Sequence, residues 1–506
     1  MTYALEFRGI VKRFGNLAAN DHIDLAINSG EIHSIVGENG AGKTTLMNIL
    51  YGLYQPDSGE MYIQGRRVEF KSPADSIRAG LGMVHQQFML FPSFTVAENV
   101  IFGSEPSRYG LIDRRTAYKK IRELSEQYGL GLDPAVKVGN LPVGTRQKVE
   151  IVKTLYRKAN ILILDEPTAV LTPQERDGLF DILRSLTAQG KTVLFITHKL
   201  NEVMDVSTHA TVLRNGRVTA NLRTVDTNPE EITRNMVGRD VMLMVEKPPF
   251  MSGPEVLKVV DLLVKDEMGH ERIKGMSLNI HGGEIVGIAG VAGNGQSELV
   301  EAIVGLRPVD GGEIFLNQVA ISHTPLVDRR TEISYIPEDR TSVGSAVDAR
   351  VTENLMMGFQ TQPIISKNQF LQNAGILKFA RQLIEQFGIK VSTASERMSN
   401  LSGGNMQKAI VARELTHGHP LLVADQPTRG VDIGSIEFIY QQLINYRSDG
   451  KAILLVSADL NEIMTLSDRI LVLFEGKLAG EVDARTAQEN TLGLMMTGAW
   501  IGSKNG

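Results

Sequence analysis

A lysine and a threonine end a glycine-rich stretch, GENGAGKT at residues 37–44, with the types and spacing of a phosphate-binding loop. The pattern G-x-x-x-x-G-K-S/T is meaningful between a strand and a helix, and here an apolar run precedes it and a helix-like segment follows. Backbone N–H groups of the glycines converge on phosphate oxygens, and the helix N-terminus adds partial positive charge. Lys43 would then reach the β- and γ-phosphates and Thr44 would bind Mg²⁺, whereas an ordinary glycine turn is the alternative. The residues predicted to bind nucleotide here are Gly37, Asn39, Gly40, Gly42, Lys43, Thr44 and Thr45.

Two adjacent carboxylates, Asp165 and Glu166, directly follow the apolar run ILIL at 161–164. The run predicts a buried strand, and open α/β sheets bind ligands at the carboxyl ends of their strands. Asp165 would hold Mg²⁺ directly or through water, and Glu166 would polarise the water that attacks a phosphoanhydride. His198 ends the next apolar run, TVLFIT at 192–197, and could contact the γ-phosphate. The alternatives are an acidic turn after a strand and a structural histidine.

The chain repeats itself when it is compared with itself at a shift of 253 residues. GEIHSIVGENGAGKTTLMNILYGLYQPDSGE at 30–60 lies over GEIVGIAGVAGNGQSELVEAIVGLRPVDGGE at 283–313. Further along, LPVGTRQKVEI at 141–151 matches LSGGNMQKAIV at 401–411. The chain is therefore predicted to contain two copies of one domain. The three loop glycines recur in the second copy as Gly290, Gly293 and Gly295.

Alternating strands and helices must position these residues in each copy. The apolar runs are short and are separated by helix-length amphipathic stretches, which predicts an α/β fold with a mostly parallel sheet buried on both faces. The segment EKPPFMSGPE at 246–255 contains three prolines and a glycine, so we expect a linker there. The predicted domains are 1–245 and 256–500.

Composition narrows the classes of function. The 506 residues are 42% hydrophobic and 22% charged, with a net charge of −5, which argues against a nucleic-acid partner because such binding needs clustered positive charge. The absence of cysteine excludes disulfides and cysteine-ligated metal sites. We expect no signal peptide and no membrane-spanning helix, since no run of about 18 apolar residues occurs. Any contact with a membrane must then come through a partner.

Both copies resemble the ATPase domains of ABC transporters, and the likeness covers almost the whole chain twice. The resemblance implies two tandem P-loop NTPase domains, each a mostly parallel sheet flanked by helices with an antiparallel β subdomain and a helical subdomain, and it implies ATP and Mg²⁺. LSGGNMQ at 401–407 is similar to the family's signature sequence, which grips the γ-phosphate of ATP bound to the opposite domain. The corresponding residues are Ser402, Gly403 and Gly404, with a simple helix cap as the alternative.

Three further positions match family motifs. Gln86 in MVHQQFML lies at the position of the loop that senses nucleotide and contacts the transmembrane partner, so it is a candidate for catalysis and for Mg²⁺ binding. Phe14 in VKRFG matches the aromatic residue that stacks on adenine, although it could be a core phenylalanine. Asp432 lies at the D-loop position.

The second copy lacks several of these groups. Gln296 replaces Lys43, Gln426 replaces Glu166, Ala458 replaces His198 and Glu338 replaces Gln86. Asp425 and Ser297 remain, so this loop, with Gly290, Gly293, Gly295 and Ser297, could still bind Mg-nucleotide weakly. Losing one preorganised charge or base typically costs about 3–5 kcal/mol of barrier.

The first copy has different losses: Pro142 and Val143 interrupt its signature, and Thr172 occupies its D-loop position. In the head-to-tail dimer implied by the resemblance, these losses are sorted between two composite sites. One site would combine every intact residue, namely Lys43, Asp165, Glu166, His198, Ser402, Gly404 and Asp432. The other would combine Gln296, Gln426 and Ala458 with Pro142, Val143 and Thr172, so we expect one competent and one degenerate ATP site.

A fused pair of such domains, with GVAGNGQ in the second loop and IPEDR at 336–340, resembles the ATPase subunit of bacterial carbohydrate-uptake importers, which include ribose, galactose and nucleoside systems. HQQFMLFPSFTVAENV and ILILDEPTAVLTPQE look nearest to the nucleoside type. The resemblance implies a peripheral subunit on the cytoplasmic face of the bacterial membrane, two transmembrane permease subunits and, indirectly, an extracytoplasmic solute-binding protein. The apolar segment 88–94 is expected to contact a permease, with local packing as the alternative.

Two other classes of ABC protein and a binding module without turnover are the alternatives. A soluble twin-ABC ATPase acting on ribosomes should have two competent catalytic glutamates and a long charged linker, whereas Gln426 and a linker of about ten residues stand here. A DNA-repair or chromosome-organising ATPase should carry a zinc module or a long coiled coil, and neither is indicated. The third alternative is a module that binds nucleotide without hydrolysing it. It is excluded only if Glu166 and Lys43 support hydrolysis.

Overall fold

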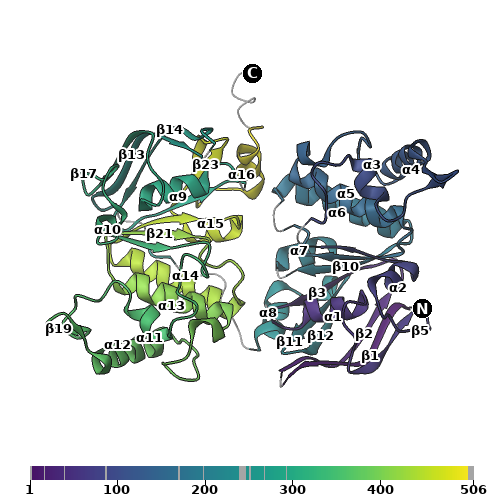
Figure 1. The fold of residues 1–506 in the computed structure, drawn as a ribbon, viewed down its shortest axis with the longest axis horizontal. Coiled ribbons are helices and arrows are strands. Elements are labelled where there is room, and N and C mark those ends of the chain that lie inside the picture. The colour runs from purple at the N-terminus through teal and green to yellow at the C-terminus, as the bar shows by residue number, and fades with distance from the viewer. Residues whose placement is uncertain are drawn as a thin grey trace. The chain divides into compact units, whose positions relative to one another are not determined.

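The computed structural model describes residues 3–15, 17–38, 40–85, 88–168, 171–197, 199–238, 247–249, 252–266, 268–291 and 293–499. The chain divides into two compact units, Met1–Val241 and Met242–Gly506 (Figure 1). Among the described residues, no helix combines the length and the apolar character that crossing a membrane requires.

A six-stranded sheet forms the centre of the first unit, in the order β12-β11-β3-β10-β9-β6. Its neighbours pair in parallel except at the edge, where β12 runs antiparallel to β11. The strands are β3 (Ile32–Gly37), β6 (Leu81–Val84), β9 (Ile161–Asp165), β10 (Thr192–Thr197), β11 (His209–Arg214) and β12 (Arg217–Arg223).

Alternate residues of these strands bury into two different cores, as a sheet covered on both faces requires. Leu162 and Leu164 of β9 pack with helices on one face, whereas Ile161 and Ile163 pack against α1 and the antiparallel strands on the other. The register pairs Asp165 with Ile196 and brings the carboxyl ends of β3, β9 and β10 to one edge. The candidate catalytic residues are carried at this edge.

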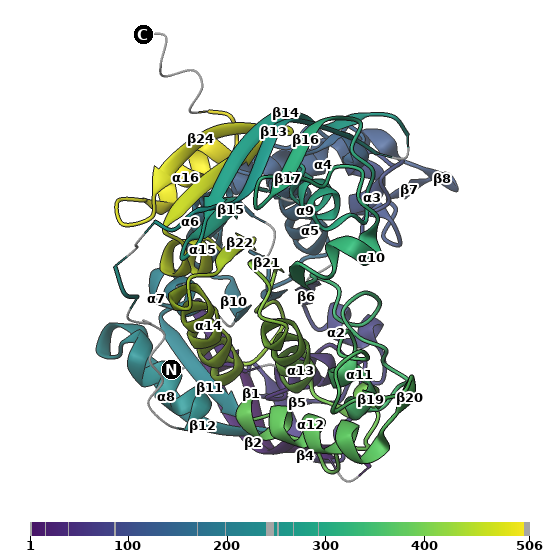
Figure 2. The ribbon, with the colours of Figure 1, turned by 90° about the vertical axis from the view of Figure 1, so that its left-hand side faces the viewer.

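Helices and a second sheet cover the two faces. Figure 1 shows α5 and α6 on one side of the central strand β10, with α1, β1 and β2 on the other. The helices are α1 (Lys43–Leu50), α2 (Pro73–Arg78), α3 (Val96–Ile101), α4 (Arg114–Gln127), α5 (Val143–Tyr156), α6 (Pro173–Ala188), α7 (Leu200–Val206) and α8 (Pro229–Val237). The antiparallel sheet, ordered β2-β1-β4-β5, contains β1 (Tyr3–Phe14), β2 (Leu17–Asn28), β4 (Ser58–Ile63) and β5 (Arg66–Val68). A hairpin of β7 (Ser107–Arg108) and β8 (Leu111–Ile112) joins α3 to α4 and projects outward (Figure 2).

The second unit repeats this architecture. Its central sheet has the order β18-β21-β22-β15-β23-β24 and its antiparallel sheet the order β14-β13-β16-β17. The strands are β13 (Glu255–Lys265), β14 (Glu271–His281), β15 (Ile285–Ala289), β16 (Gly311–Leu316), β17 (Val319–Ala320), β18 (Ile333–Ile336), β19 (Ser366–Lys367), β20 (Phe370–Leu371), β21 (Leu421–Asp425), β22 (Ala452–Val456), β23 (Arg469–Phe474) and β24 (Lys477–Asp483). The helices are α9 (Gln296–Val304), α10 (Leu326–Arg329), α11 (Val351–Met356), α12 (Asn373–Gln386), α13 (Gly403–Thr416), α14 (Ile433–Ser448), α15 (Leu460–Leu466) and α16 (Glu489–Met496). The predicted α/β fold, a mostly parallel sheet with an antiparallel and a helical part in each copy, is confirmed.

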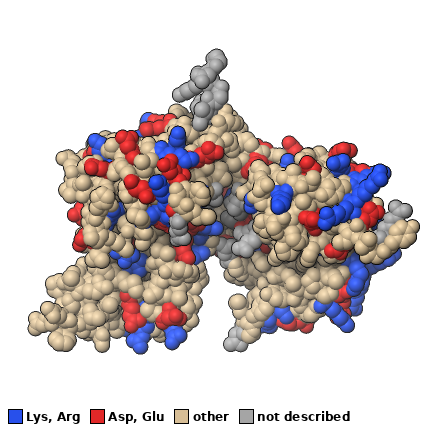
Figure 3. Space-filling view, turned by 45° about the horizontal axis from the view of Figure 1, so that its top comes forward, with Lys and Arg blue, Asp and Glu red and all other residues tan. Residues whose placement is uncertain are grey.

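Charged side chains are distributed unevenly over each unit. On the face shown in Figure 3, acidic and basic groups are interspersed over much of the surface, and Lys and Arg gather at the outer end of the first unit. The part of the second unit at the lower left shows few charged side chains in this view. In the same unit, Phe370 and Leu371 of β20 are exposed.

Candidate nucleotide-binding and catalytic site

The glycine-rich loop of the first unit joins β3 to α1, and two of its glycines are required by close packing. A Cβ atom on Gly37 would collide with the carbonyl of Leu213, and one on Gly42 with the carbonyl of Ala19. Gly42 also has a φ of +101°, in the left-handed region that favours glycine, and begins α1 as its N-cap. The loop is therefore drawn tightly around the start of the helix, where backbone N–H groups have no helical partners.

Lys43 is the first residue of α1, and its side chain, which reaches back into the loop, leaves the residue only 6% exposed. Its Nζ donates hydrogen bonds to the carbonyls of Gly37 at 2.6 Å and Glu38 at 3.0 Å. Burial lowers the pKa of the Lys43 ammonium, and the carboxylates of Glu166 and Asp165 oppose that effect. Thr44, by contrast, is exposed at the first turn of α1, with Thr45 half-buried beside it. The charge that would meet phosphate is thus held inside the loop beside both candidate carboxylates.

β9 ends at Asp165, and Glu166 follows it directly. Burial raises the pKa of Asp165, the neighbouring Glu166 raises it further, and Lys43 lowers it. Glu166 has a φ of +45°, which is rare for a residue with a side chain, and its N–H donates to the carbonyl of Ile196 at 2.9 Å. A non-glycine residue held in this region marks a backbone that the surrounding fold constrains, as is common at functional sites.

The remaining predicted residues of the first site are Asn39, Gln86, His198, Gly40 and Phe14. Asn39, Gln86 and His198 lie outside the described residues. Gly40 is exposed with a φ of +82°. The Phe14 ring, at the end of β1, is 45% exposed and meets the ring of Tyr54 edge-on at 5.5 Å. This exposure does not suit the alternative in which Phe14 is a core residue.

A buried glutamate that the sequence reasoning missed organises the turns after β9 and β10. Glu202 is 3% exposed and accepts hydrogen bonds from Thr168 Oγ1 at 2.7 Å and from Thr197 Oγ1 at 3.0 Å. In the second unit Glu462 accepts the equivalent bond from Thr428 Oγ1 at 2.8 Å. The recurrence of LNE at 200–202 and 460–462 was the signal that could have found it.

The loop of the second unit keeps its shape and loses its charge. Gly295 is the N-cap of α9 with a φ of +104°, and Gly293 has a φ of +91°. Gln296 Nε2 donates to the carbonyl of Gly290 at 2.8 Å, the same contact that Lys43 makes with Gly37. Ser297 is exposed at the first turn of α9. The glutamine therefore replaces the lysine sterically but supplies no cation.

The carboxyl end of β21 carries Asp425 and is followed by Gln426. Burial and the nearby Glu301 raise the pKa of Asp425 to about 7, so its carboxyl holds a proton far more readily than an exposed aspartate does. Gln426 has a φ of +50°, matching Glu166, and its Oε1 accepts a hydrogen bond from the Ala458 N–H at 3.1 Å. The Gln426 amide cannot act as a base, and moving it would break its hydrogen bond with the Ala458 N–H.

The signature-like turn lies at the start of α13. Ser402 is exposed and caps the helix, because its Oγ accepts from the N–H of Asn405 at 3.4 Å and from Asn405 Nδ2 at 2.9 Å. A Cβ atom on Gly404 would collide with the carboxylate of Asp432, which itself caps α14 through Ser435. The helix-cap role is therefore present, and it leaves the Ser402 hydroxyl hydrogen and the exposed turn available to a ligand.

The equivalent turn of the first unit has no side-chain cap. Pro142 is the N-cap of α5 and Val143 the first helical residue. Thr172 is buried and caps α6 in a reciprocal pair with Glu175, so it faces its own helix. The first unit therefore has neither the hydroxyl of Ser402 nor the carboxylate of Asp432 at these positions.

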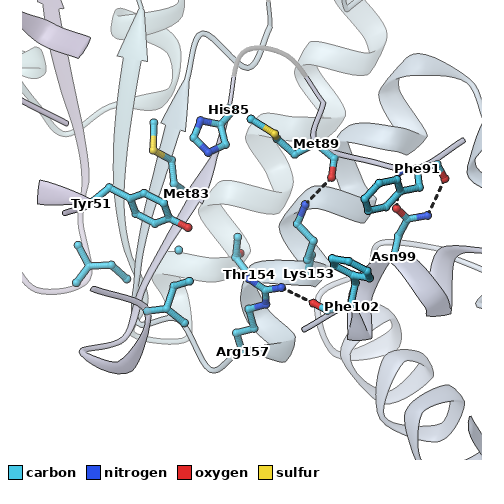
Figure 4. Close-up of a pocket in the computed structure, with 13 residues that line it drawn as sticks. Tyr51, Met83, His85, Met89, Phe91, Asn99, Phe102, Lys153, Thr154 and Arg157 are labelled. Carbon is cyan, nitrogen blue, oxygen red and sulfur yellow. Dashed lines mark hydrogen bonds between the residues drawn. The ribbon is translucent and has the colours of Figure 1, made fainter. Parts of the chain in front are cut away.

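An open pocket of about 220 Å³ lies beside the segment that follows Gln87 (Figure 4). Its rim exposes Met89, Phe91 and Phe102, while Lys153 donates to the Met89 carbonyl at 3.1 Å and Arg157 to the Phe102 carbonyl at 2.6 Å. Tyr51, Ile77, Leu81, Gly82, Met83, His85, Asn99 and Thr154 complete the lining. A rim of exposed apolar side chains around a hollow suits an apolar partner better than local packing.

The two positive-φ glycines of the first loop allow a test of its packing. Gly42→Ala should lower the free energy of unfolding of the first unit by about 2–5 kcal/mol, because the residue must adopt a left-handed φ and its Cβ meets backbone that cannot move aside. Gly40→Ala has the left-handed φ but open space around it, so about 1–2 kcal/mol is expected. Denaturant titration of both variants measures the difference, and equal losses would contradict this account of the loop.

The family described as ABC transporter matches residues 20–169 and 273–429, one match in each unit. The chain is 46% identical over 500 residues to the guanosine import ATP-binding protein NupO of Bacillus subtilis (strain 168), which covers 99% of this chain and 98% of that protein. It is 38% identical over 497 residues to the ribose import ATP-binding protein RbsA 1 of Rubrobacter xylanophilus, covering 98% of each.

A solved structure with the same fold covers most of the chain. The archaeal ribosome recycling factor aABCE1, in complex with the ribosomal stalk protein aP1, covers 92% of this chain and 87% of that chain with a TM-score of 0.60. At 20% sequence identity this likeness concerns the fold alone.

Proposed function

Because this chain belongs to the ABC transporter family and is an ATP hydrolase of the import type, we propose that it drives the uptake of a nucleoside through a separate membrane permease. The observation that carries the proposal is the 46% identity, over nearly the full length of both chains, to a guanosine import ATP-binding protein. The 38% identity to a ribose import protein makes a simple sugar the second candidate solute.

Hydrolysis is proposed to occur at the loop of the first unit. The N–H groups at the start of α1 and the ammonium of Lys43 bind the β- and γ-phosphates, and Lys43 exchanges its carbonyl partners for phosphate oxygens. The Glu166 carboxylate accepts a hydrogen bond from the attacking water and orients it towards the γ-phosphorus. The Phe14 ring is exposed where it could stack on adenine, and His198 and Gln86 are proposed to complete the contacts of the γ-phosphate and the metal.

The carboxylate of Asp165 fits a divalent cation. It is part-buried at the strand end with its pKa raised by burial and by Glu166, so a neighbouring cation would stabilise its charged form. Asp165, Thr44 and Gln86 are the proposed Mg²⁺ ligands, and when bound the ion would neutralise charge on the β- and γ-phosphates.

We further propose that the site is composite. Ser402, Gly403 and Gly404 at the start of α13, with Asp432, would contact the γ-phosphate of the ATP held by Lys43. The second loop, with Gln296, Gln426 and an Asp425 whose pKa is raised by burial, would bind nucleotide at most weakly through Gly290, Gly293, Gly295 and Ser297. This arrangement yields one effective hydrolysis for each closure of the two units.

The pocket beside α3 is proposed to receive a segment of one of two permease subunits, and the loop after Glu338 would receive the other. Its apolar rim suits an amphipathic helix laid into a groove. The subunit would thus sit on the cytoplasmic face of the bacterial membrane, touching it only through the permease, and an extracytoplasmic solute-binding protein would act indirectly.

Phe91→Glu should weaken binding to the permease at least about tenfold, because a carboxylate in an apolar interface must be desolvated without a partner. The Phe91 ring contacts Phe94 and Phe102 at centroid distances of 5.1 and 5.2 Å on the rim. Co-purification with a co-expressed permease measures the effect, and turnover by the isolated chain should stay within about twofold of wild type. Val225→Glu is the matched control, since Val225 is 77% exposed and lies outside the pocket. If both variants bind equally well, the pocket is not the docking site.

The solute is tested by reconstituting the chain with its permeases and solute-binding protein in vesicles. ATP turnover and uptake should respond to guanosine or another nucleoside and not to ribose or galactose. A response to a simple sugar alone would replace the nucleoside assignment and leave the import function intact.

A role on ribosomes is the alternative from another class. The aABCE1 likeness concerns the fold alone, and Gln426 gives the second unit an amide in place of a catalytic carboxylate at that position. Sedimentation with ribosomes in place of co-purification with a permease would favour this alternative.

A further inference from the structure

An arginine in the loop after β18 contacts two functional turns of the second unit at once. Arg340 donates from Nη1 to the carbonyl of Gly403 and from Nη2 to the carbonyl of Gly430, each at 3.3 Å. Gly403 belongs to the signature-like turn, and Gly430 lies two residues before Asp432. One planar guanidinium therefore joins the two turns that are proposed to contact ATP.

The residues next to Arg340 form a second contact between this loop and the turn at residues 429–430, and they hold the backbone of Arg340 in place. Glu338 pairs with Arg429, although both side chains are largely exposed, so this pair by itself contributes little. The Asp339 carboxylate accepts from the N–H groups of Thr341 and Ser342, each at 2.9 Å, and Ser345 Oγ donates to the Arg340 carbonyl at 2.7 Å. The backbone that carries Arg340 is thus held in a hydrogen-bonded turn.

The first unit has neither the arginine nor the glycine at the equivalent positions. The fourth residue after β18 is Arg340, whereas the fourth residue after β6 is Phe88, and Val143 stands where the second unit has Gly403. A Cβ atom would lie 3.3 Å from Arg340 Nη1 at Gly403 and 2.9 Å from Nη2 at Gly430. The two glycines leave room for the guanidinium, so arginine and glycines form a matched set that the second unit alone carries.

We propose that Arg340 is a positioning residue for ATP hydrolysis, which holds the Ser402 turn and the approach to Asp432 in one arrangement and links both to the loop that meets the permease. This inference rests on the proposed composite site. The rigid fork of a guanidinium suits the task, because two donors at fixed spacing define the separation of the two carbonyls. Glu338, which stands where the first unit has Gln86, then belongs to a loop that has gained a structural role as well as having lost a catalytic group.

Arg340→Gln in the complete complex with its permeases should lower kcat for ATP at least about tenfold, since misplacing a group by about 1 Å at a phosphoryl-transfer site is costly. KM for ATP should change less than about threefold, because Lys43 and the first loop are untouched. Arg340→Lys should give an intermediate kcat, as an ammonium can reach one carbonyl but cannot span both. The matched control is Arg381→Gln, an exposed position on α12, which should behave as wild type.

A merely structural arginine would give a different pattern. Arg340→Gln would then lower the midpoint of thermal unfolding while kcat per folded molecule stayed within about twofold of wild type, and that result would overturn the proposal. Ser402→Ala is measured in parallel to separate the two ideas. If Ser402→Ala turns over ATP normally, the composite site fails and this inference with it; if Ser402→Ala is impaired and Arg340→Gln is not, only the role of Arg340 is lost.

Discussion

Glu166→Gln is expected to reduce steady-state ATP turnover by about 10²–10⁴-fold, the range attributed to a general base, while ATP binding is preserved. The amide cannot accept a proton from the attacking water. The backbone should tolerate the change, because the second unit already holds Gln426 at a φ of +50° where Glu166 has +45°. Binding should not suffer either, since removing the Glu166 charge removes one cause of the raised pKa of Asp165.

Phosphate release and equilibrium ATP binding, measured on the same preparation, check this expectation. The matched control is Gln426→Glu, which restores the carboxylate in the other unit. Turnover should stay within about twofold of wild type there, because Gln296 still supplies no cation to that loop. Retention of more than about a tenth of the activity in Glu166→Gln would remove Glu166 from the catalytic role.

The second large effect is expected at the signature-like turns, where the two units should respond unequally. Ser402→Ala removes a hydroxyl proposed to donate to a charged phosphate, so kcat should fall about 10–100-fold. Pro142→Ser, the equivalent position in the first unit, should change kcat less than about twofold, because that turn would face the degenerate loop. Steady-state ATPase assays of both variants in the permease complex measure the contrast.

The helix-capping role of Ser402 requires its own control. Losing this cap costs about 1 kcal/mol of stability, which thermal unfolding of Ser402→Ala would detect. Ser402→Thr keeps both the hydroxyl and the cap, so its kcat should remain near wild type. Equal sensitivity of positions 402 and 142 would refute the sorting of the two sites.

The fold and the first loop could be predicted because each depends on local pattern. The spacing in GENGAGKT is required by backbone geometry, as the collisions expected at Gly37 and Gly42 show. The α/β architecture follows from short apolar runs between amphipathic segments, and the same pattern occurs in both copies. Asp165 and Glu166 were placed at a strand end because the apolar run before them is buried on both faces.

Other parts of the site were not predictable in this way. Glu202 is of a residue type that usually lies at the surface, yet it is buried because the turn after β9 and the last residue of β10 bring Thr168 and Thr197 to it. The segment 88–94 was expected to contact a partner, but only the packed structure shows a pocket there, lined by residues from β6 and α5.

The sequence by itself determined that this protein is two copies of one ATPase domain and that the copies have lost different groups, because identities and spacings record both facts. Only the tertiary structure decided that Gln296 takes over the hydrogen bond of Lys43, that Gln426 is tied to Ala458, and that Arg340 joins Gly403 to Gly430. The physical reason is that these contacts depend on where the chain brings distant carbonyl and N–H groups, which residue types and spacing do not specify.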